Sequence, residues 1–524
     1  MSSTSPHINA NEDIGHEDKN LSSKRDFNND GPFMNTSTPI NLQLQGTFKK
    51  SFAFYSLKVR LPVILTKVID YLSREGARIK SEHNASDEDV RHVIEYISQL
   101  KNELVTNKKY IPLKVDTAEA QRWNEYIQEA DPPYYFTNVW LFSECYVYRR
   151  LREACELTNG LRNFDPFDEQ KDRSFADSLE PMCVVADKLT DMVIDNDDEK
   201  RRANFITLLK ICLWANKCDL SLSKGEQVTL SGKARAFIDP FKIISDLKDM
   251  LLVDDSAEIC DQVIAKADSM AKFLEEQGIS EASMAESTEP QAVMFDIVCD
   301  NSGYELFSDL CLAHFLISQK IVQKVRFHVK NIPWFVSDVT PRDFKFVINS
   351  CEQANYYREV TAQANPESSE NKVTEELKPF KIINSDKLRA LGGIWKQYVE
   401  NGSFILMSDD FWTSPHAYKD MKKYDPDLYK KLQLAVAVLF KGDLNYRKLL
   451  GETNWISTLS FEQALQGFMP APVIALRTVK ADLICGLPEG KFEELSKIDE
   501  KWMEKGDYGV IQFCAKSEPL KGKI

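Results

Sequence analysis

Seven short apolar segments recur in the second half of this chain and constrain its fold more than any other feature. They are AVMFDIVC, KVRFHV, PWFVSD, SFILMSDD, LAVAVLF, VIALRT and GVIQFC, between residues 292 and 514. Helical patterns fill the intervals; within residues 304–320, Leu306, Leu310, Ala313 and Ile317 share one helical face. Apolar strands separated by helices are typical of a parallel sheet covered on both faces. The pattern therefore predicts an α/β fold.

Composition divides the rest of the chain. Residues 1–46 are rich in Ser, Asn and Asp, which predicts a disordered tail with order beginning near Phe52. Residues 47–284 carry apolar residues at helical spacing, as in LPVILTKVIDYL, and predict a mainly α-helical domain. Residues 285–515 form the α/β region, in which the polar stretch after Thr361 predicts a surface excursion. Residues 516–524 are a short C-terminal tail.

Charge and cysteine usage exclude several classes of partner. The chain carries 66 basic and 80 acidic residues, a net charge of −14, which disfavours nucleic acid and anionic membranes. No apolar run reaches the roughly 18 residues that span a bilayer, and no signal peptide is recognisable. The 11 cysteines are scattered without a C-x-x-C pair, which predicts a reducing compartment: the cytoplasm, with the nucleus as a second location. We expect no obligate protein partner.

Polar side chains follow three of the expected strands. FDIVC runs into Asp300 and Asn301, WFV runs into Ser337 and Asp338, and FILM runs into residues 408–410, Ser-Asp-Asp. Because ligands bind outside the carboxyl ends of parallel strands, we expect Asp300 and Asp338 on the same rim of the sheet. Carboxylate and amide oxygens suit Mg²⁺, Mn²⁺ and other octahedral divalent cations.

Cationic side chains follow two further expected strands. AVLF runs into Lys441, and VIAL runs into Arg477 and Lys480. Arg477 is expected to bind phosphate as a fork, and the two lysines as point charges. The helix that should begin near Gly303 adds N–H groups and a positive dipole end. A metal beside phosphate-binding groups indicates phosphoryl chemistry.

Each segment alone also has a plainer interpretation. Asp-Asn-Ser-Gly is a good turn and helix N-cap sequence, and Ser-Asp-Val-Thr suits an ordinary strand-to-loop junction. Joint placement at successive strand ends is what favours a site. The chain contains no H-E-x-x-H, G-x-S-x-G or G-x-G-x-x-G motif, which argues against a zinc hydrolase, a serine hydrolase and a dinucleotide-binding enzyme.

Five motifs in a fixed order closely resemble the damage-control phosphatase family, also called domain of unknown function 89. They are WANKCDLSLS, DNSGYEL, IPWFVSDVT, LFKGDLNYRKL and LRTVKADL. The Arg-Thr-x-Lys motif at residues 477–480 is similar to that of the third subfamily, the sugar-phosphate branch that includes acidic residue methyltransferase. RLPVILTKVIDYL and ECYVYRR also resemble its N-terminal helical part. The resemblance covers roughly residues 51–513.

The resemblance implies a three-layer α/β/α Rossmann-like sheet with an N-terminal helical domain. It also implies a divalent metal, usually Mn²⁺, Co²⁺ or Ni²⁺, held by Asp300, Asn301 and Asp338, with Asp300 and Asp338 as catalytic residues. Residues that match the family's substrate-binding positions are Glu305, Asp443, Leu444, Asn445, Tyr446, Arg447 and Lys480.

The resemblance favours a metal-dependent phosphatase that hydrolyses small sugar phosphates such as fructose 1-phosphate and fructose 6-phosphate. Either water or a carboxylate, that of Asp300, would attack the phosphorus. The alternative is an S-adenosylmethionine-dependent carboxyl methyltransferase, which the absence of a Gly-rich strand-to-helix loop disfavours. A non-catalytic binding module is the third hypothesis.

Overall fold

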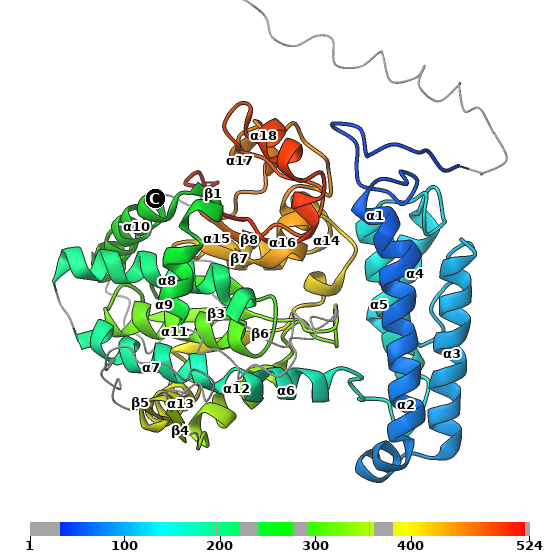
Figure 1. The fold of residues 1–524 in the computed structure, drawn as a ribbon, viewed down its shortest axis with the longest axis horizontal. Helices are drawn as coiled ribbons and strands as arrows, with labels where there is room; N and C mark the ends of the chain where they lie inside the picture. Colours follow the sequence, from blue (N-terminus) through cyan, green and yellow to red (C-terminus); the bar gives the residue numbers. More distant parts are fainter. Residues whose placement is uncertain are drawn as a thin grey trace, which may run out of the picture.

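A computed structural model describes residues 32–194, 197–218, 239–276, 292–355, 357–360 and 381–518 (Figure 1). Four expectations therefore fall wholly or partly outside the described residues. These are residues 1–31 of the expected tail, the polar stretch after Thr361, residues 219–223 of WANKCDLSLS, and residues 519–524 of the C-terminal tail. No described helix is both long enough and apolar enough to span a membrane.

The centre of the fold is a seven-stranded sheet in the order β1-β9-β8-β7-β2-β3-β6. All neighbouring strands are parallel except β8 and β9. The expected α/β fold with a largely parallel sheet is therefore confirmed. Its strands are β1 (Leu251–Asp254), β2 (Met294–Val298), β3 (Lys324–His328), β6 (Phe404–Met407), β7 (Val438–Lys441), β8 (Val473–Thr478) and β9 (Gly509–Cys514). A separate antiparallel pair consists of β4 (Tyr357–Val360) and β5 (Lys381–Asn384).

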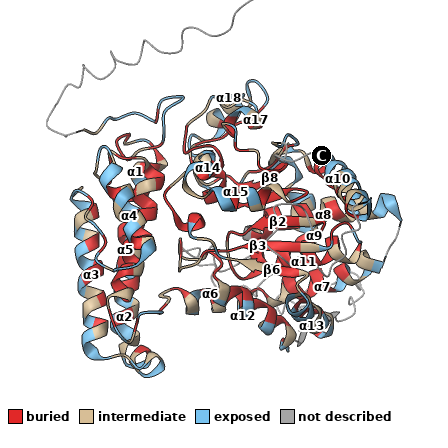
Figure 2. Cartoon of the chain, turned by 180° about the vertical axis from the view of Figure 1, so that it is seen from behind, coloured by how far each residue is buried: buried red, intermediate tan, exposed pale blue. Residues whose placement is uncertain are grey.

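Alternate residues of the central strands enter two different cores. On β7, Val438 and Phe440 pack into one core and Leu439 into the other. The core that contains Leu439 is closed by α7 (Leu179–Ile194), α8 (Asp198–Cys218), α10 (Ser256–Glu276), α11 (Tyr304–Ser318), α12 (Pro341–Glu352) and α13 (Asp386–Glu400). In Figure 2 the strands lie as a buried layer among these helices. The sheet is therefore covered on both faces, as a parallel sheet requires.

The opposite core joins the sheet to the N-terminal helices and to the short C-terminal helices. The N-terminal helices are α1 (Phe52–Tyr55), the π-helix η1 (Ser56–Arg60), α2 (Leu61–His83), α3 (Asp87–Val105), α4 (Ala118–Glu129) and α5 (Trp140–Glu156). The remaining helices are α6 (Asp168–Asp177), α9 (Pro240–Asp246), η3 (Lys248–Met250), η4 (Asp410–Thr413), η5 (Tyr418–Asp420), α14 (Met421–Tyr424), α15 (Pro426–Gln433), α16 (Gly442–Leu449), α17 (Phe461–Ala464), α18 (Lys491–Ile498) and η6 (Trp502–Glu504).

Three sequence expectations differ from this architecture. Residues 334–336, expected as a strand, are irregular, because Phe335 and Val336 lie in a turn and both adopt positive φ (45° and 72°), which a strand does not allow. Strand β1 lies within residues 47–284, which were expected to be mainly helical, and it pairs with β9. Ordered chain also begins upstream of Phe52, because Leu44 is fully buried and Gln45 bridges to Val139.

Candidate active site

The two central strands β2 and β7 create the position at which a ligand is expected. From β2 the chain proceeds through β3 to β6 on one side, and then returns to β7 and β8 on the other. At such a switch point the connections leave in opposite directions and open a crevice at the carboxyl ends of the strands. Asp300 lies two residues after β2, and Gly442 follows β7 directly. The topology therefore places these two residues together.

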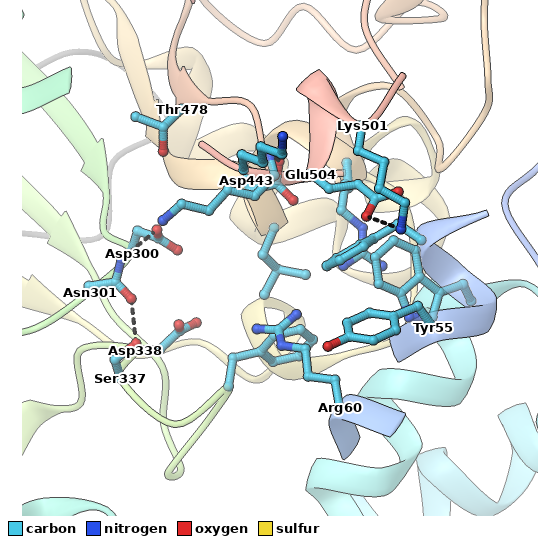
Figure 3. Close-up of a pocket in the computed structure, with 17 residues that line it drawn as sticks. Tyr55, Arg60, Asp300, Asn301, Ser337, Asp338, Asp443, Thr478, Lys501 and Glu504 are labelled. Atoms are coloured by element: carbon cyan, nitrogen blue, oxygen red, sulfur yellow. Dashed lines mark hydrogen bonds and ion pairs between the residues drawn. The ribbon is translucent and has the colours of Figure 1, made fainter. Parts of the chain in front are cut away.

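Two loops are hydrogen-bonded to each other at this crevice. The backbone N–H of Val339 donates to the carbonyl of Asp300 at 2.9 Å, and Asn301 and Asp338 form an isolated antiparallel bridge. The hydroxyl of Ser337 donates to Oδ1 of Asn301 at 2.5 Å (Figure 3). The side chains of Asp300, Asn301 and Asp338 are thereby held next to one another, as the sequence predicts for a shared rim.

The route to Asp338 differs from the expected one. Asp338 does not end a strand; it follows an irregular loop after β3 and precedes α12. Thr340 caps α12 with a reciprocal capping box to Asp343, which fixes where the loop ends. Asp338 therefore reaches the rim through a loop and not through a strand of its own.

Burial and mutual repulsion perturb both acids of this group. Burial, followed by the nearby Glu305 and Asp338 carboxylates, raises the pKa of Asp300 well above its usual value. Burial likewise raises the pKa of Asp338 to about 6, although Lys330, whose Nζ lies 3.3 Å from Oδ2 of Asp338, opposes this shift. Within the described part of the chain, Oδ2 of Asp338 accepts no hydrogen bond of good geometry.

This donor set fits a divalent cation. A cation would remove the repulsion between Asp300 and Asp338 and would add a partner to Oδ2 of Asp338, whose ion pair with Lys330 is 3.3 Å long. The third side chain of this donor set is the amide of Asn301, beside the carboxylates of Asp300 and Asp338. No group of three or more His, Cys, Asp or Glu side chains with metal-binding geometry occurs within the described ranges.

Gly442 is required for the packing of Asp300. It has a φ of +82°, and a Cβ atom placed on it would lie 1.9 Å from Oδ2 of Asp300 and 2.2 Å from its Cγ. Only glycine allows β7 to turn into α16 so close to that carboxylate. This close contact explains why a glycine stands in the sequence Lys-Gly-Asp at the end of β7.

The loops open into a cavity of about 750 Å³ (Figure 3). Of the residues predicted for the site, the cavity is lined by Asp300, Asn301, Asp338, Asp443, Leu444, Arg447 and Lys480. Its other lining residues are Phe52, Tyr55, Arg60, Trp140, Phe335, Ser337, Thr478, Lys501, Glu504 and Lys505.

Three predicted residues lie behind this lining. Glu305 accepts a hydrogen bond from Nδ2 of Asn301 at 2.9 Å. Asn445 donates to the carbonyl of Lys441 at 2.7 Å, and Tyr446 donates to Oε1 of Gln512 at 2.6 Å. Their substrate-binding roles stay predictions, and their observed contacts are with the protein.

Of the three cations expected to bind phosphate, only Lys480 lines the cavity. The fork of Arg477 is fully buried and donates to Asp443 and to two backbone carbonyls, so its expected contact with phosphate is wrong. Lys441 is buried too, with Nζ 2.7 Å from Asp309 and 3.2 Å from Glu305. Both cations are needed to neutralise acids of the protein itself.

Residues 408–410, the acidic segment that follows β6, do not line this cavity. Ser408, Asp409 and Asp410 line a different pocket of about 460 Å³, next to α4. Asp409 forms an ion pair with Lys431 at 3.1 Å. The reason is position in the sheet, because β6 is the edge strand and lies two strands away from β2.

One wall of the cavity was missed by sequence reasoning. Phe52, Tyr55 and Arg60 come from the N-terminal helices, and residues 501–505 come from η6 and the residues beside it. Of these residues, Arg60 has one sequence signal, because RLPVILTKVIDYL, which resembles the family's helical part, begins with it. Side-chain type and spacing alone do not separate them from an ordinary helix surface.

Comparisons with known proteins agree on one family. The model of the damage-control phosphatase ARMT1-like domain matches residues 56–495. The chain is 36% identical over 483 residues to damage-control phosphatase ARMT1 of Danio rerio, covering 90% of this chain and 96% of the relative. It is 37% identical over 474 residues to the protein of that name from Rattus norvegicus (88% and 96%). For the Homo sapiens protein the identity is 35% over 486 residues (90% and 98%).

Proposed function

Because this chain belongs to the damage-control phosphatase ARMT1-like family, we propose that it is a metal-dependent phosphatase of small sugar phosphates. The names of its relatives support a phosphatase. Fructose 1-phosphate and fructose 6-phosphate are the proposed substrates, in the cytoplasm and with the nucleus as a second location. The observation that carries the proposal is the convergence of Asp300, Asn301, Asp338 and Lys480 on one cavity.

Asp300, Asn301 and Asp338 would hold the divalent cation. Mn²⁺, Co²⁺ or Ni²⁺ is proposed, with Mg²⁺ as the alternative, since carboxylate and amide oxygens suit such ions. When bound, the cation would supply charge neutralisation at the phosphoryl oxygens. Ser337 orients Asn301 by donating to its Oδ1, which leaves the amide fixed against the two carboxylates.

Lys480 would bind the phosphate. Within the described ranges no carboxylate lies within 4.0 Å of its Nζ, yet it is close enough to lower the pKa of Asp300. Asp443 holds the start of the Lys480 loop by accepting from its backbone N–H at 3.2 Å. Leu444 and Arg447 would shape the wall against the sugar, and Arg447 is itself held by Glu452.

The experiment is a screen of the purified protein against a panel of metals and sugar phosphates, with inorganic phosphate as the readout. We expect metal-stimulated release from both fructose phosphates, and loss of release in Asp338→Asn. The matched control is Asp409→Asn, which removes a carboxylate after another strand of the same sheet and should retain activity. Methyl transfer from labelled S-adenosylmethionine that survives metal removal, without phosphate release, would refute the proposal.

A further inference from the structure

The cavity has a second wall whose charge the phosphatase centre does not use. In Figure 3, Arg60 and Tyr55 lie across the cavity from Asp300, Asn301 and Asp338, and the guanidinium of Arg60 points into the open space. Arg60 is the last residue of the π-helix η1, so it belongs to the N-terminal helices and not to the sheet. The two walls therefore come from different parts of the fold.

The charge of Arg60 is only weakly neutralised by the protein. Its sole ion pair within the described ranges is to Glu144, at 4.0 Å, and its side chain is 45% exposed. Glu144 is already engaged: Oε2 accepts from Arg447 at 2.7 Å and Oε1 from the hydroxyl of Ser56 at 3.4 Å. By contrast Arg447, the neighbouring arginine of the cavity, is fully paired with Glu144 and Glu452.

Other groups make the same wall suited to an anion. Lys501 and Lys505 also line it; Lys505 is paired with Asp499 at 2.5 Å, whereas Lys501 lies 3.6 Å from the carboxylate of Glu504. Tyr55 also lines the cavity, beside Arg60, and Figure 3 shows its hydroxyl directed into the open space. Cations gathered on one wall, in a chain of net charge −14, create a local positive potential that would attract an anion.

The size of the cavity leaves room for a ligand that reaches this wall. A volume of about 750 Å³ lies in the upper part of the range of about 300–1,000 Å³ that holds drug-sized ligands. The predicted metal ligands and Lys480 account for one phosphoryl group. Within the described ranges Arg60 has only the distant Glu144 as an ion-pair partner, and Tyr55 lines the same space.

We infer that Arg60, with the hydroxyl of Tyr55, is a specificity site for a second anionic group on the substrate. The substrate class is a phosphomonoester that also carries a carboxylate or a second phosphate at its far end. The reacting phosphate would bind at Asp300, Asp338 and Lys480, and the second anion at Arg60. This inference rests on the proposed phosphatase function.

The test compares matched substrate pairs that differ in the second anion. The pairs are glycerol 3-phosphate with 3-phosphoglycerate, glucose 6-phosphate with 6-phosphogluconate, and fructose 6-phosphate with fructose 1,6-bisphosphate. The enzyme is the full chain with Mn²⁺, and kcat and KM are measured for the wild type, Arg60→Gln, Arg60→Lys and Lys58→Gln. Lys58 is the matched control, because it is an exposed cation on the same π-helix that does not line the cavity.

We expect the wild type to prefer at least one doubly anionic member over its partner. Arg60→Gln should lower kcat/KM for that member about tenfold or more, mainly through KM, as expected for losing one charge-assisted hydrogen bond. It should change the singly anionic partner less than about twofold. Arg60→Lys should restore part of the loss, and Lys58→Gln should match the wild type. A carboxylate and a phosphate are distinguished by which pair shows the effect.

Equal losses on both members of every pair would overturn the inference, because Arg60 would then only attract or position the reacting phosphate. Hydrolysis with no preference in any pair and no effect of Arg60→Gln would overturn it while leaving the phosphatase function intact. Absence of hydrolysis of every compound with every metal would overturn both. Thermal denaturation of each variant confirms that the fold is retained.

Discussion

Nε of Arg477 donates a hydrogen bond to Oδ1 of Asp443 at 2.7 Å, and the backbone N–H of Lys480 donates to the same oxygen at 3.2 Å. The remaining nitrogens of Arg477 donate to the carbonyls of Leu483 at 2.6 Å and Ala481 at 2.9 Å. The arginine of the Arg-Thr-x-Lys motif therefore does not face the cavity. It holds the loop that presents Lys480.

Replacing Arg477 with lysine should raise KM for sugar phosphates and destabilise the protein. A lysine cannot reproduce the fork, so at least one buried carbonyl loses its donor, at a cost of about 1–3 kcal/mol in the free energy of unfolding. Arg326→Lys is the matched control, since Arg326 is a buried fork on Asp296 outside the cavity. Both variants should unfold at lower urea concentration, but only Arg477→Lys should change KM. An unchanged KM in Arg477→Lys would contradict a positioning role.

The sequence predicts well that Asp300 lies at the rim of the sheet, because the signal for it is local. Asp300 follows an unmistakable buried strand, and its placement in the crevice then follows from parallel topology. Asp338 was placed on the right rim for the wrong reason, since Phe335 and Val336 adopt positive φ and cannot extend a strand. The buried strand before Asp300 is a local signal, whereas the path of the chain to Asp338 depends on backbone conformations that apolar composition does not encode.

Residue type did not predict which cation would be buried against an acid and which would line the cavity. Arg477 and Lys480 are both cations at one strand end, yet one is buried against Asp443 and the other lines the cavity. Their difference arises from the position of α16, which brings Asp443 to Arg477. Arg60 lies 240 residues before Asp300 in the chain, and only the packing of the N-terminal helices brings it to the site.

Gly442→Ala should abolish phosphatase activity by displacing Asp300. The added Cβ would meet Oδ2 of Asp300 at 1.9 Å, and the φ of +82° adds backbone strain of about 1–2 kcal/mol. Gly467→Ala is the matched control, because Gly467 has a φ of +86° with nothing within 4 Å of an added Cβ. We expect both variants to lose thermal stability from backbone strain, and Gly442→Ala to lose more because of the overlap with Asp300, with phosphate release lost only in Gly442→Ala. Retained activity in Gly442→Ala would show that Asp300 can move without consequence.

Asp300→Asn should abolish metal binding without destabilising the fold. In the metal-free protein Asp300 is buried beside Asp338 and Glu305, which raise its pKa, so removing its charge relieves repulsion and the Tm should not fall. Mn²⁺ should raise the Tm of the wild type, and a chelator should reverse this, whereas the variant should show no shift. Activity should fall about a hundredfold or more, because charge neutralisation by a metal contributes several kcal/mol.

The contrast for this variant is Asp309→Asn. Asp309 is also buried, but its carboxylate lies 2.7 Å from Nζ of Lys441, so its removal should lower the Tm of the metal-free protein. A fall in Tm of similar size in both variants would mean that Asp300 is held by the protein alone. A Tm shift with Mn²⁺ that persists in Asp300→Asn would remove it from the ligand set.

Stability should decline at acid pH because His314 is buried as a neutral ring. It lies on α11 with 4% of its surface exposed, and burial lowers its pKa from 6.5 to about 4. Between these two values the unfolded chain binds the proton and the folded protein does not, so stability rises with pH across this window and is lost as pH falls. At about pH 5 the cost is about 2 kcal/mol relative to about pH 7.5.

The measurement is urea unfolding of the wild type, His314→Phe and His314→Gln at about pH 7.5 and about pH 5. Both variants lack the titrating ring, so the loss of unfolding free energy between the two pH values should shrink by about 2 kcal/mol in each. Comparing the change with pH within each protein removes the effect of the substitution on packing, which differs between Phe and Gln. An undiminished loss in both variants would show that His314 is not the group that takes up the proton on unfolding. Among the residues that the structure describes, Nδ1 of His314 has no hydrogen-bond partner, Nε2 lies 3.4 Å from the hydroxyl of Ser318, and no acid is placed to stabilise a protonated ring.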